Sequence, residues 1–147
     1  MSKGISGLFS NISSVKSIYR KGAIDKARDL IKNTPNGKIK SVVVGAYDAS
    51  TGKAYASFAG KIPNKIHPKL MELAEEIGGI GSHGLTDKNI VGVCAEFHVV
   101  NDMLNSGVKY SDIKIVKAIR PRTGKFIPFC KNCKTMFKDI IDDQKEI

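Results

Sequence analysis

"CAEFHVVNDML" spans residues 94–104 and predicts an amphipathic helix that begins with a thiol and a carboxylate. Cys94 and Glu96 fall in the first turn, where the positive end of the helix dipole favours negative charge. A carboxylate at a helix start is common, so Glu96 alone does not indicate a function. Apolar residues at three- and four-residue spacing form the face that we expect to anchor the helix to the core: Phe97, Val100 and Leu104.

The other two cysteines give this helix start a chemical interpretation. Cys130 and Cys133 form a Cys-x-x-Cys pair in "PFCKNC", at the start of a second predicted helix. This spacing suits two ligands of a tetrahedral zinc ion, although a redox pair or two buried thiols would also satisfy it. Cys94 as a third ligand leaves the fourth position open, which is typical of catalytic zinc. Glu96 would then carry protons for the water at the metal.

Composition and charge limit the class of protein. A chain of 147 residues with 41% hydrophobic and 26% charged residues is typical of one soluble globular domain. No stretch approaches the roughly 20 apolar residues of a membrane helix, and no apolar segment resembles a signal peptide. We therefore expect no membrane partner and no targeting signal. Three cysteines, an odd number, argue against a disulfide framework.

The net charge of +10 favours a polyanionic partner, most often nucleic acid, over a merely Lys-rich soluble surface. The charge is concentrated near the Cys-x-x-Cys pair, because residues 109–134 contain one acidic residue, Asp112. The basic residues of this region are Lys109, Lys114, Lys117, Arg120, Arg122, Lys125, Lys131 and Lys134.

The remaining patterns predict an α/β architecture in which a hairpin leads into a sheet. Residues 1–36 are expected to be an N-terminal leader or helical extension, with a frayed segment at 1–10 and one or two short helices after it. The elements expected after this extension are a hairpin over 38–60, a helix over 67–79, a long Gly-rich loop, the helix from Cys94, a buried strand over 112–121 and a helix over 130–141.

The segments "CAE" and "PFCKNC" together resemble the signature of zinc-dependent deaminases, which is His or Cys, any residue, Glu, and then Pro-Cys-x-x-Cys. The resemblance to the cytidine deaminase-like superfamily covers about residues 38–140, where the predicted elements follow the order of that superfamily. It implies a three-layer α/β/α fold with a central mixed sheet and two zinc-site helices, and a deaminase domain over 37–147. Two features differ: Phe129 occupies the usual proline position after Pro128, and the first ligand is Cys instead of His.

The resemblance implies an enzyme that hydrolyses cytosine to uracil, with Zn2+ bound by Cys94, Cys130 and Cys133 and with Glu96 as the catalytic proton carrier. We expect the substrate base to contact the backbone N–H of Ala95, the ring of Phe129 and His83 in the loop "GIGSHGLTDKN". The alternatives are a core aromatic for Phe129 and an exposed loop histidine for His83.

Within the superfamily, the chain is most similar to bacterial polymorphic-toxin deaminases, in particular the YwqJ-like group. This resemblance implies the C-terminal toxin domain of a larger secreted protein, which acts on DNA or RNA in the target-cell cytoplasm and is blocked by a cognate immunity protein. One alternative is a free-nucleoside cytidine deaminase, although "YDASTGKAYASFAGKIPNK" lacks the Asn-x-Glu ribose motif of those enzymes. Another is a non-catalytic zinc-stabilised module that binds nucleic acid, which predicts four protein ligands and no role for Glu96.

Overall fold

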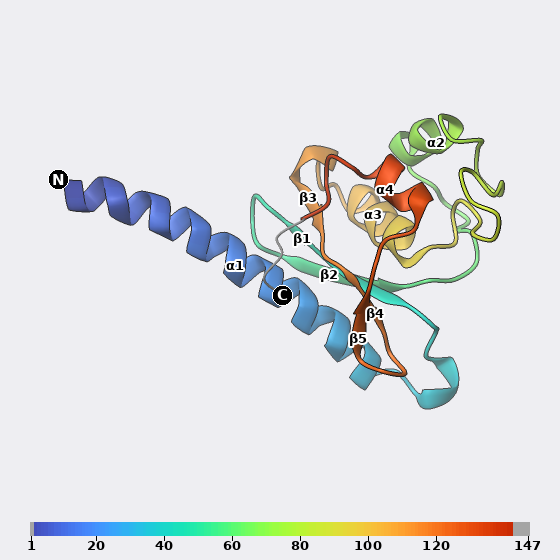
Figure 1. Cartoon of the computed structure of the whole chain (residues 1–147), viewed down its shortest axis with the longest axis horizontal. Helices are drawn as coiled ribbons and strands as arrows, with labels where there is room; N and C mark the ends of the chain where they lie inside the picture. Colours follow the sequence, from blue (N-terminus) through green and yellow to red (C-terminus); the bar gives the residue numbers. More distant parts are fainter. Residues whose placement is uncertain (1, 143–147) are drawn as a thin grey trace.

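Helices lie on both faces of an antiparallel sheet of five strands (Figure 1). The computed structural model describes the backbone of residues 2–142 and the side chains of residues 15–142. The helices are α1 (Ser2–Lys32), α2 (Pro68–Glu75), α3 (Ala95–Asn105) and α4 (Lys131–Met136), with short 3-10 turns η1 (Asn36–Lys38) and η2 (Tyr110–Asp112). The strands are β1 (Val43–Asp48), β2 (Ala54–Phe58), β3 (Ile113–Ile115), β4 (Ala118–Arg120) and β5 (Lys125–Ile127).

Strand β1 is the centre of the sheet. All six of its residues are buried, because helices cover it on both faces, and its sequence is accordingly a nearly continuous apolar run. The predicted hairpin is confirmed: β1 and β2 pair antiparallel, with Val43 opposite Phe58 and Tyr47 opposite Ala54. On its other edge β1 pairs with both β3 and β4.

The single strand predicted over 112–121 is interrupted in the structure. Ala46 lies opposite Ile115, whereas Val43, three residues earlier, lies opposite Ile119, four residues later. The extra residue is a bulge between β3 and β4, and bulges of this kind bend a strand. Strand β5 was not predicted, because three residues are too few to show a period. It pairs with β4 across the predicted turn at "RTGK".

The prediction of a mixed sheet is wrong for the five strands, since every strand pair is antiparallel. Short connections join β1 to β2 and β4 to β5, and a tight turn can only reverse the chain. Within residues 2–142, parallel pairing is limited to an isolated bridge between Ile115 and Ile141. This bridge joins β3 to the segment after α4. The α/β class itself is confirmed, because helices pack on both faces of the sheet.

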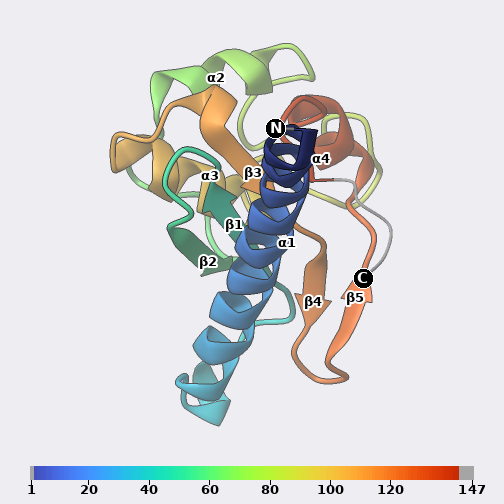
Figure 2. The ribbon, with the colours of Figure 1, turned by 90° about the vertical axis from the view of Figure 1, so that its left-hand side faces the viewer.

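The N-terminal region forms one continuous helix of 31 residues, so the prediction of a frayed leader followed by short helices is wrong. The segment contains no proline, and its C-terminal half packs on the sheet with Ala23, Ile24 and Ala27 buried. This packing stabilises a helix that its glycines weaken. The N-terminal half projects beyond the sheet (Figures 1 and 2). The boundary between 36 and 37 remains a prediction.

Small residues allow α1 to approach β1 closely. Ala23 and Ala27 are fully buried, and a Cβ on Gly45 of β1 would collide with the backbone of Ala23. A side chain at position 45 would therefore push the helix off the sheet. Arg20 of α1 adds a polar anchor, because its Nε donates to Oδ2 of Asp142 at 3.2 Å.

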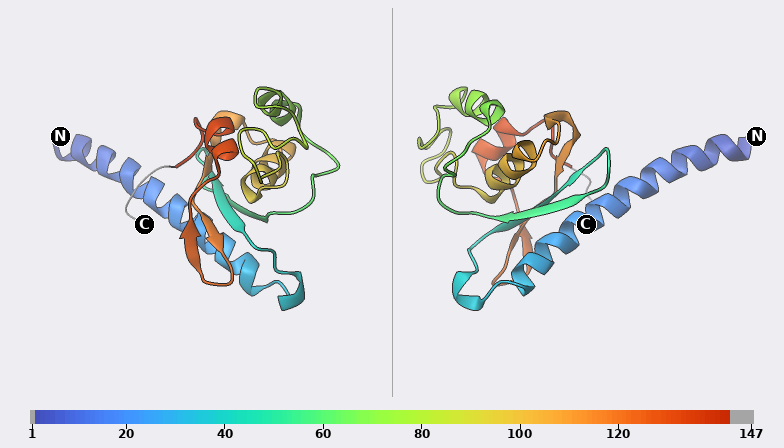
Figure 3. Two further views of the ribbon diagram at one scale, coloured as in Figure 1. Left: turned by 45° about the vertical axis from the view of Figure 1, so that its right-hand side comes forward. Right: turned by 180° about the vertical axis from the view of Figure 1, so that it is seen from behind.

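The opposite face of the sheet carries α2, α3 and α4 (Figure 3). The predicted anchor face of α3 is confirmed, since Phe97, Val100 and Leu104 are all buried. Helix α4 is shorter than predicted and ends at Met136, because the chain turns so that the N–H of Ile115 can donate to the carbonyl of Ile140 at 2.8 Å. None of the helices within residues 2–142 combines the length and apolar character needed to cross a membrane.

Candidate metal centre

Two helix starts place the three cysteines. Cys94 is the N-cap residue of α3, and Cys130 is the N-cap residue of α4, both with extended backbone. Cys133 lies in the first turn of α4 and is buried, whereas the other two cysteines are half-buried. Strand β5 leads into α4, so the pairing of β5 with β4 determines where the Cys-x-x-Cys pair lies.

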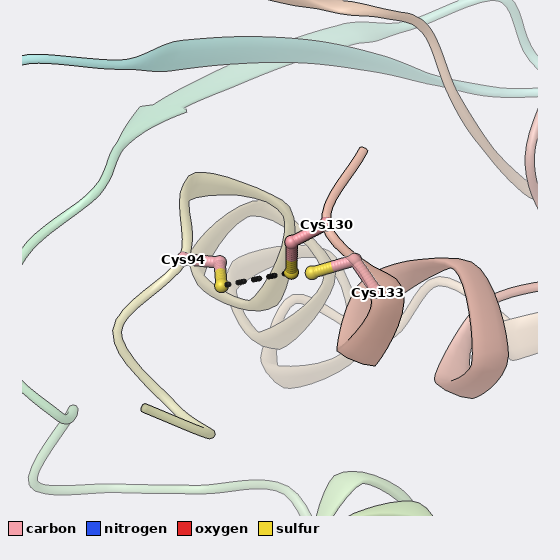
Figure 4. A group of neighbouring side chains, drawn as sticks. All are labelled: Cys94, Cys130 and Cys133. Atoms are coloured by element: carbon pink, nitrogen blue, oxygen red, sulfur yellow. Dashed lines mark hydrogen bonds between the residues drawn. The ribbon is translucent and has the colours of Figure 1, made fainter. Parts of the chain in front are cut away.

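The three sulfur atoms converge, as Figure 4 shows. All three lie within 4.8 Å of one another, and the Sγ atoms of Cys94 and Cys130 are 3.8 Å apart. Tetrahedral zinc with Zn–S bonds of about 2.3 Å requires sulfur–sulfur distances of about 3.8 Å. The cysteines could therefore bind a metal ion with little rearrangement. Within the described residues the cluster has three members, which leaves a tetrahedral ion one position open.

The protonation of the thiols also favours a cation. Hydrogen bonding with the thiols of Cys133 and Cys94 lowers the pKa of the Cys130 thiol. The same hydrogen bonds to Cys130 raise the pKa of Cys94 and that of Cys133 above the usual range. A metal ion would allow all three thiols to ionise, because coordination deprotonates a thiol.

Glu96 lies beside the cluster in the interior. Glu96 is only 5% exposed. The Sγ of Cys133 donates a hydrogen bond to Oε1 of Glu96 at 3.8 Å. Burial raises the pKa of Glu96 to about 7. A carboxyl group with this pKa can both accept and donate a proton near neutral pH, as a general acid–base group must.

The predicted substrate residues have different environments. Ala95 is buried at the start of α3, next to Cys94. Phe129 is half-buried and packs against the core beside Cys130. His83 is exposed, and its Nδ1 lies 3.3 Å from the carbonyl oxygen of Asn89 in the same loop. Ala95 and Phe129 therefore lie at the cysteine cluster because each is next to a cysteine in the sequence. The ring of His83 instead contacts its own loop.

The other two histidines have structural roles. His67 is the N-cap residue of α2, where its Nδ1 accepts the N–H of Lys69 at 3.1 Å. The Nε2 of His98 lies 3.3 Å from the carbonyl oxygen of Gly60 and so links α3 to the segment after β2. Neither belongs to the cysteine cluster.

Asn132, inside the Cys-x-x-Cys pair, is a site residue that the sequence pattern did not indicate. Its side chain is 1% exposed, donates to the carbonyl oxygen of His83 at 3.0 Å and accepts the N–H of Leu85 at 2.7 Å. Gly84 lies against the same amide, and a Cβ on this residue would collide with the side chain of Asn132. Gly84 also has a positive φ of 61°, which favours glycine. Asn132 thereby attaches the Gly-rich loop to the helix that carries Cys130 and Cys133.

No protein-family model, no curated protein and no solved structure matches the chain.

Proposed function

We propose that the chain is a zinc-dependent hydrolytic deaminase that converts cytosine to uracil in nucleic acid. The observation that carries this proposal is the buried carboxyl of Glu96 beside a cluster of three cysteines with sulfurs within 4.8 Å of one another. A closed structural zinc site has four protein ligands, whereas a catalytic site has three and an open position. The carboxyl beside the cluster adds the proton carrier that hydrolysis needs.

Cys94, Cys130 and Cys133 would hold the zinc, and the ion when bound would supply a Lewis acid that activates water near neutral pH. The cytidine deaminase-like fold is part of the same proposal. Its support is the hairpin of β1 and β2, followed by α3 with Cys94 at its start, then β3, and then α4 with Cys130 at its start.

In this proposal Glu96 moves the protons. Its Oε1 accepts a proton from the attacking water and passes it to the ring nitrogen next to C4 of cytosine. The new C4–O bond forms as the water adds, and the C4–N bond to the amino group then breaks. Glu96 then takes the proton of the new C4 hydroxyl and delivers it to the amino group, so that ammonia leaves and the C4 carbonyl forms. The N–H of Ala95 and the ring of Phe129 are proposed to hold the base.

A polymer substrate agrees better than a nucleoside with the net charge of +10, because phosphate contacts position a nucleic-acid strand while a pocket reads one base. The biological role proposed with this activity is that of a toxin domain, delivered as part of a larger secreted protein to the target-cell cytoplasm and neutralised by an immunity protein.

Product sequencing tests the activity. Zinc-loaded protein is incubated with single- and double-stranded DNA and RNA that contain cytosine and adenine, and the products are sequenced for C-to-U and A-to-I changes. We expect C-to-U changes with the wild type and none with Glu96→Gln. Release of ammonia from free cytidine, with no change in any polymer, would instead support the nucleoside enzyme. Binding of nucleic acid without any base change, by wild type and Glu96→Gln alike, would support the non-catalytic module.

A further inference from the structure

A basic hollow lies where the segment before β1 meets the turn between β4 and β5. Its volume is about 530 Å3, and it is lined by three cationic residues, two polar residues and two apolar residues: Lys40, Arg120, Arg122, Asn36, Ser41, Ile39 and Pro121. The three cationic groups and the two polar side chains are all hydrogen-bond donors, and no carboxylate lines the hollow. This set of groups is suited to an anion with several acceptor oxygens.

The two segments that line the hollow contain no acidic residue. No Asp or Glu occurs between Asp29 and Asp48 or between Asp112 and Asp139, and these two stretches supply the whole lining. Among the side chains of residues 15–142, no ion pair involves Lys40, Arg120 or Arg122. The positive potential of the hollow is therefore available to a ligand.

Two short routes connect the hollow to the cysteine cluster. On one side, Val42 follows the hollow residue Ser41 and accepts the N–H of Ala59 at 3.0 Å; the next residue, Gly60, donates to the carbonyl oxygen of Val93 at 3.0 Å, directly before Cys94. On the other side, β5 runs from the hollow towards α4. Lys125 pairs with Arg120 at the hollow, and Cys130 follows five positions later.

The chain from Lys125 to Cys130 limits the distance between the hollow and the cysteine cluster. Five residues of extended chain span at most about 17 Å. This distance is within the length of a few nucleotides of one nucleic-acid strand. Contacts to the phosphates of such a strand determine its position and carry no sequence information.

We propose that the hollow lined by Lys40, Arg120 and Arg122 binds a backbone phosphate of the nucleic-acid strand whose base is deaminated. This inference rests on the proposed function, because it assigns a nucleic-acid contact to the same reaction. It also specifies the substrate further, since a strand must extend beyond the target base to reach the hollow. A free nucleoside has no group that could occupy it.

Charge reversal at the two exposed cations tests the proposal. The double variant Lys40→Glu/Arg122→Glu is compared with wild type by fluorescence anisotropy of a labelled single-stranded oligonucleotide over a range of salt concentrations. We expect binding about tenfold weaker, with the slope of log K against log salt reduced by about 0.7 for each phosphate that the variant no longer neutralises. Zinc content is measured on each protein, so that loss of the metal site is recognised.

The matched control carries the same charge change elsewhere. Lys16→Glu/Lys26→Glu reverses two exposed lysines of α1, on the opposite face of the sheet from the cysteines. We expect this control to bind within about twofold of wild type, because neither lysine lines the hollow and α1 lies on the other face of the sheet from the cysteines. Equal weakening in both double variants would overturn the proposal, since net charge alone would then explain binding.

Two further measurements distinguish a free phosphate from a backbone phosphate as the ligand. They also distinguish failure of this proposal from failure of the proposed function. If inorganic phosphate binds wild type more tightly than Lys40→Glu/Arg122→Glu while the oligonucleotide binds both proteins equally, the hollow is a free-phosphate site and the proposal is wrong. If wild type deaminates the oligonucleotide and Lys40→Glu/Arg122→Glu does so with unchanged KM, the hollow assignment fails while the proposed function stands. If nothing is deaminated but the hollow variant alone loses binding, the enzyme proposal fails and the nucleic-acid contact stands.

Discussion

The N–H of Leu85 donates to Oδ1 of Asn132 at 2.7 Å, which connects an exposed Gly-rich loop to the interior of the Cys-x-x-Cys pair. The amide of Asn132 also donates to the carbonyl oxygen of His83 at 3.0 Å. One buried side chain therefore satisfies two backbone groups of a loop that has no regular structure of its own. The position of this loop beside the cysteine cluster depends on that residue.

We expect Asn132→Ala to lower the free energy of unfolding by about 2 kcal/mol, because two backbone groups lose their partner. Urea denaturation measures this change, and hydrogen exchange at the amide of Leu85 reports the loop. Lys131→Ala is the matched control, since Lys131 is the exposed residue of the same Cys-x-x-Cys pair and should change stability by less than about 0.5 kcal/mol. Unchanged protection of the Leu85 amide in Asn132→Ala would show that the loop is held by other contacts.

Glu96→Gln should retain zinc and lower kcat for deamination by at least about a hundredfold, because the amide keeps the shape of the carboxyl but cannot carry its proton. Zinc is measured by mass spectrometry and turnover by ammonia release. A variant that keeps both zinc and near-normal turnover would exclude Glu96 as the proton carrier.

Cys94→Ala should lose high-affinity zinc, because the remaining pair supplies only two thiolates. In wild type, zinc that binds only the folded state adds about 4 kcal/mol of stability when free zinc exceeds its Kd a thousandfold. A chelator should therefore lower the Tm of wild type and leave that of Cys94→Ala unchanged. Equal metal content in the two proteins after dialysis would contradict a three-cysteine site. Substitution with Co2+ gives an independent readout through its thiolate charge-transfer absorption.

Gly45→Ala should destabilise the protein by about 2 kcal/mol, because the added methyl group overlaps the backbone of Ala23 in α1. Gly22→Ala is the opposite case: this glycine lies within α1, nothing lies within 4 Å of its Cβ position, and alanine is the better helix former. We expect it to add up to about 1 kcal/mol. Thermal denaturation should show a lower Tm for Gly45→Ala and a higher Tm for Gly22→Ala. Equal changes in Tm would show that α1 does not approach β1 closely in solution.

Tyr47→Phe should cost about 2 kcal/mol near neutral pH, because the hydroxyl of Tyr47 donates to the Asp142 carboxylate at 2.6 Å. Burial, together with this hydrogen bond, raises the pKa of Tyr47 well above its usual 10. The unfolded chain therefore loses its tyrosine proton first, so this contribution is complete below pH 10 and declines as the pH rises above it. Urea denaturation at several pH values measures the decline.

The control for Tyr47→Phe is Tyr55→Phe, since Tyr55 contributes its ring to a contact with Lys53 and, among the described residues, its hydroxyl has no hydrogen-bond partner. We expect this control to change stability little at any pH. A constant difference between wild type and Tyr47→Phe up to strongly alkaline pH would contradict the raised pKa.

Local patterns predicted the elements whose signals are long or chemically distinct. The hairpin of β1 and β2, the helix α3 with its anchor residues and the turn before β5 all follow from periodicity and turn residues within a few positions. The missed features depend on distant partners. The bulge between β3 and β4, the three-residue strand β5 and the end of α4 at Met136 arise from pairing with β1 and with Ile115, which no local window contains.

For the candidate site too, some features follow from the sequence and others only from tertiary contacts. Residue types and spacing predict that Cys94, Cys130 and Cys133 bind a metal ion and that Glu96 carries protons, and the structure shows three cysteines that could bind a metal ion. The sequence could not show that the sulfurs meet, because Cys94 and Cys130 lie 36 positions apart and converge only when α3 and α4 pack on the same face of the sheet. The same packing removes water from Glu96 and raises its pKa. Chemistry thus follows from the residues present, whereas distance and burial follow from contacts between segments that are remote along the chain.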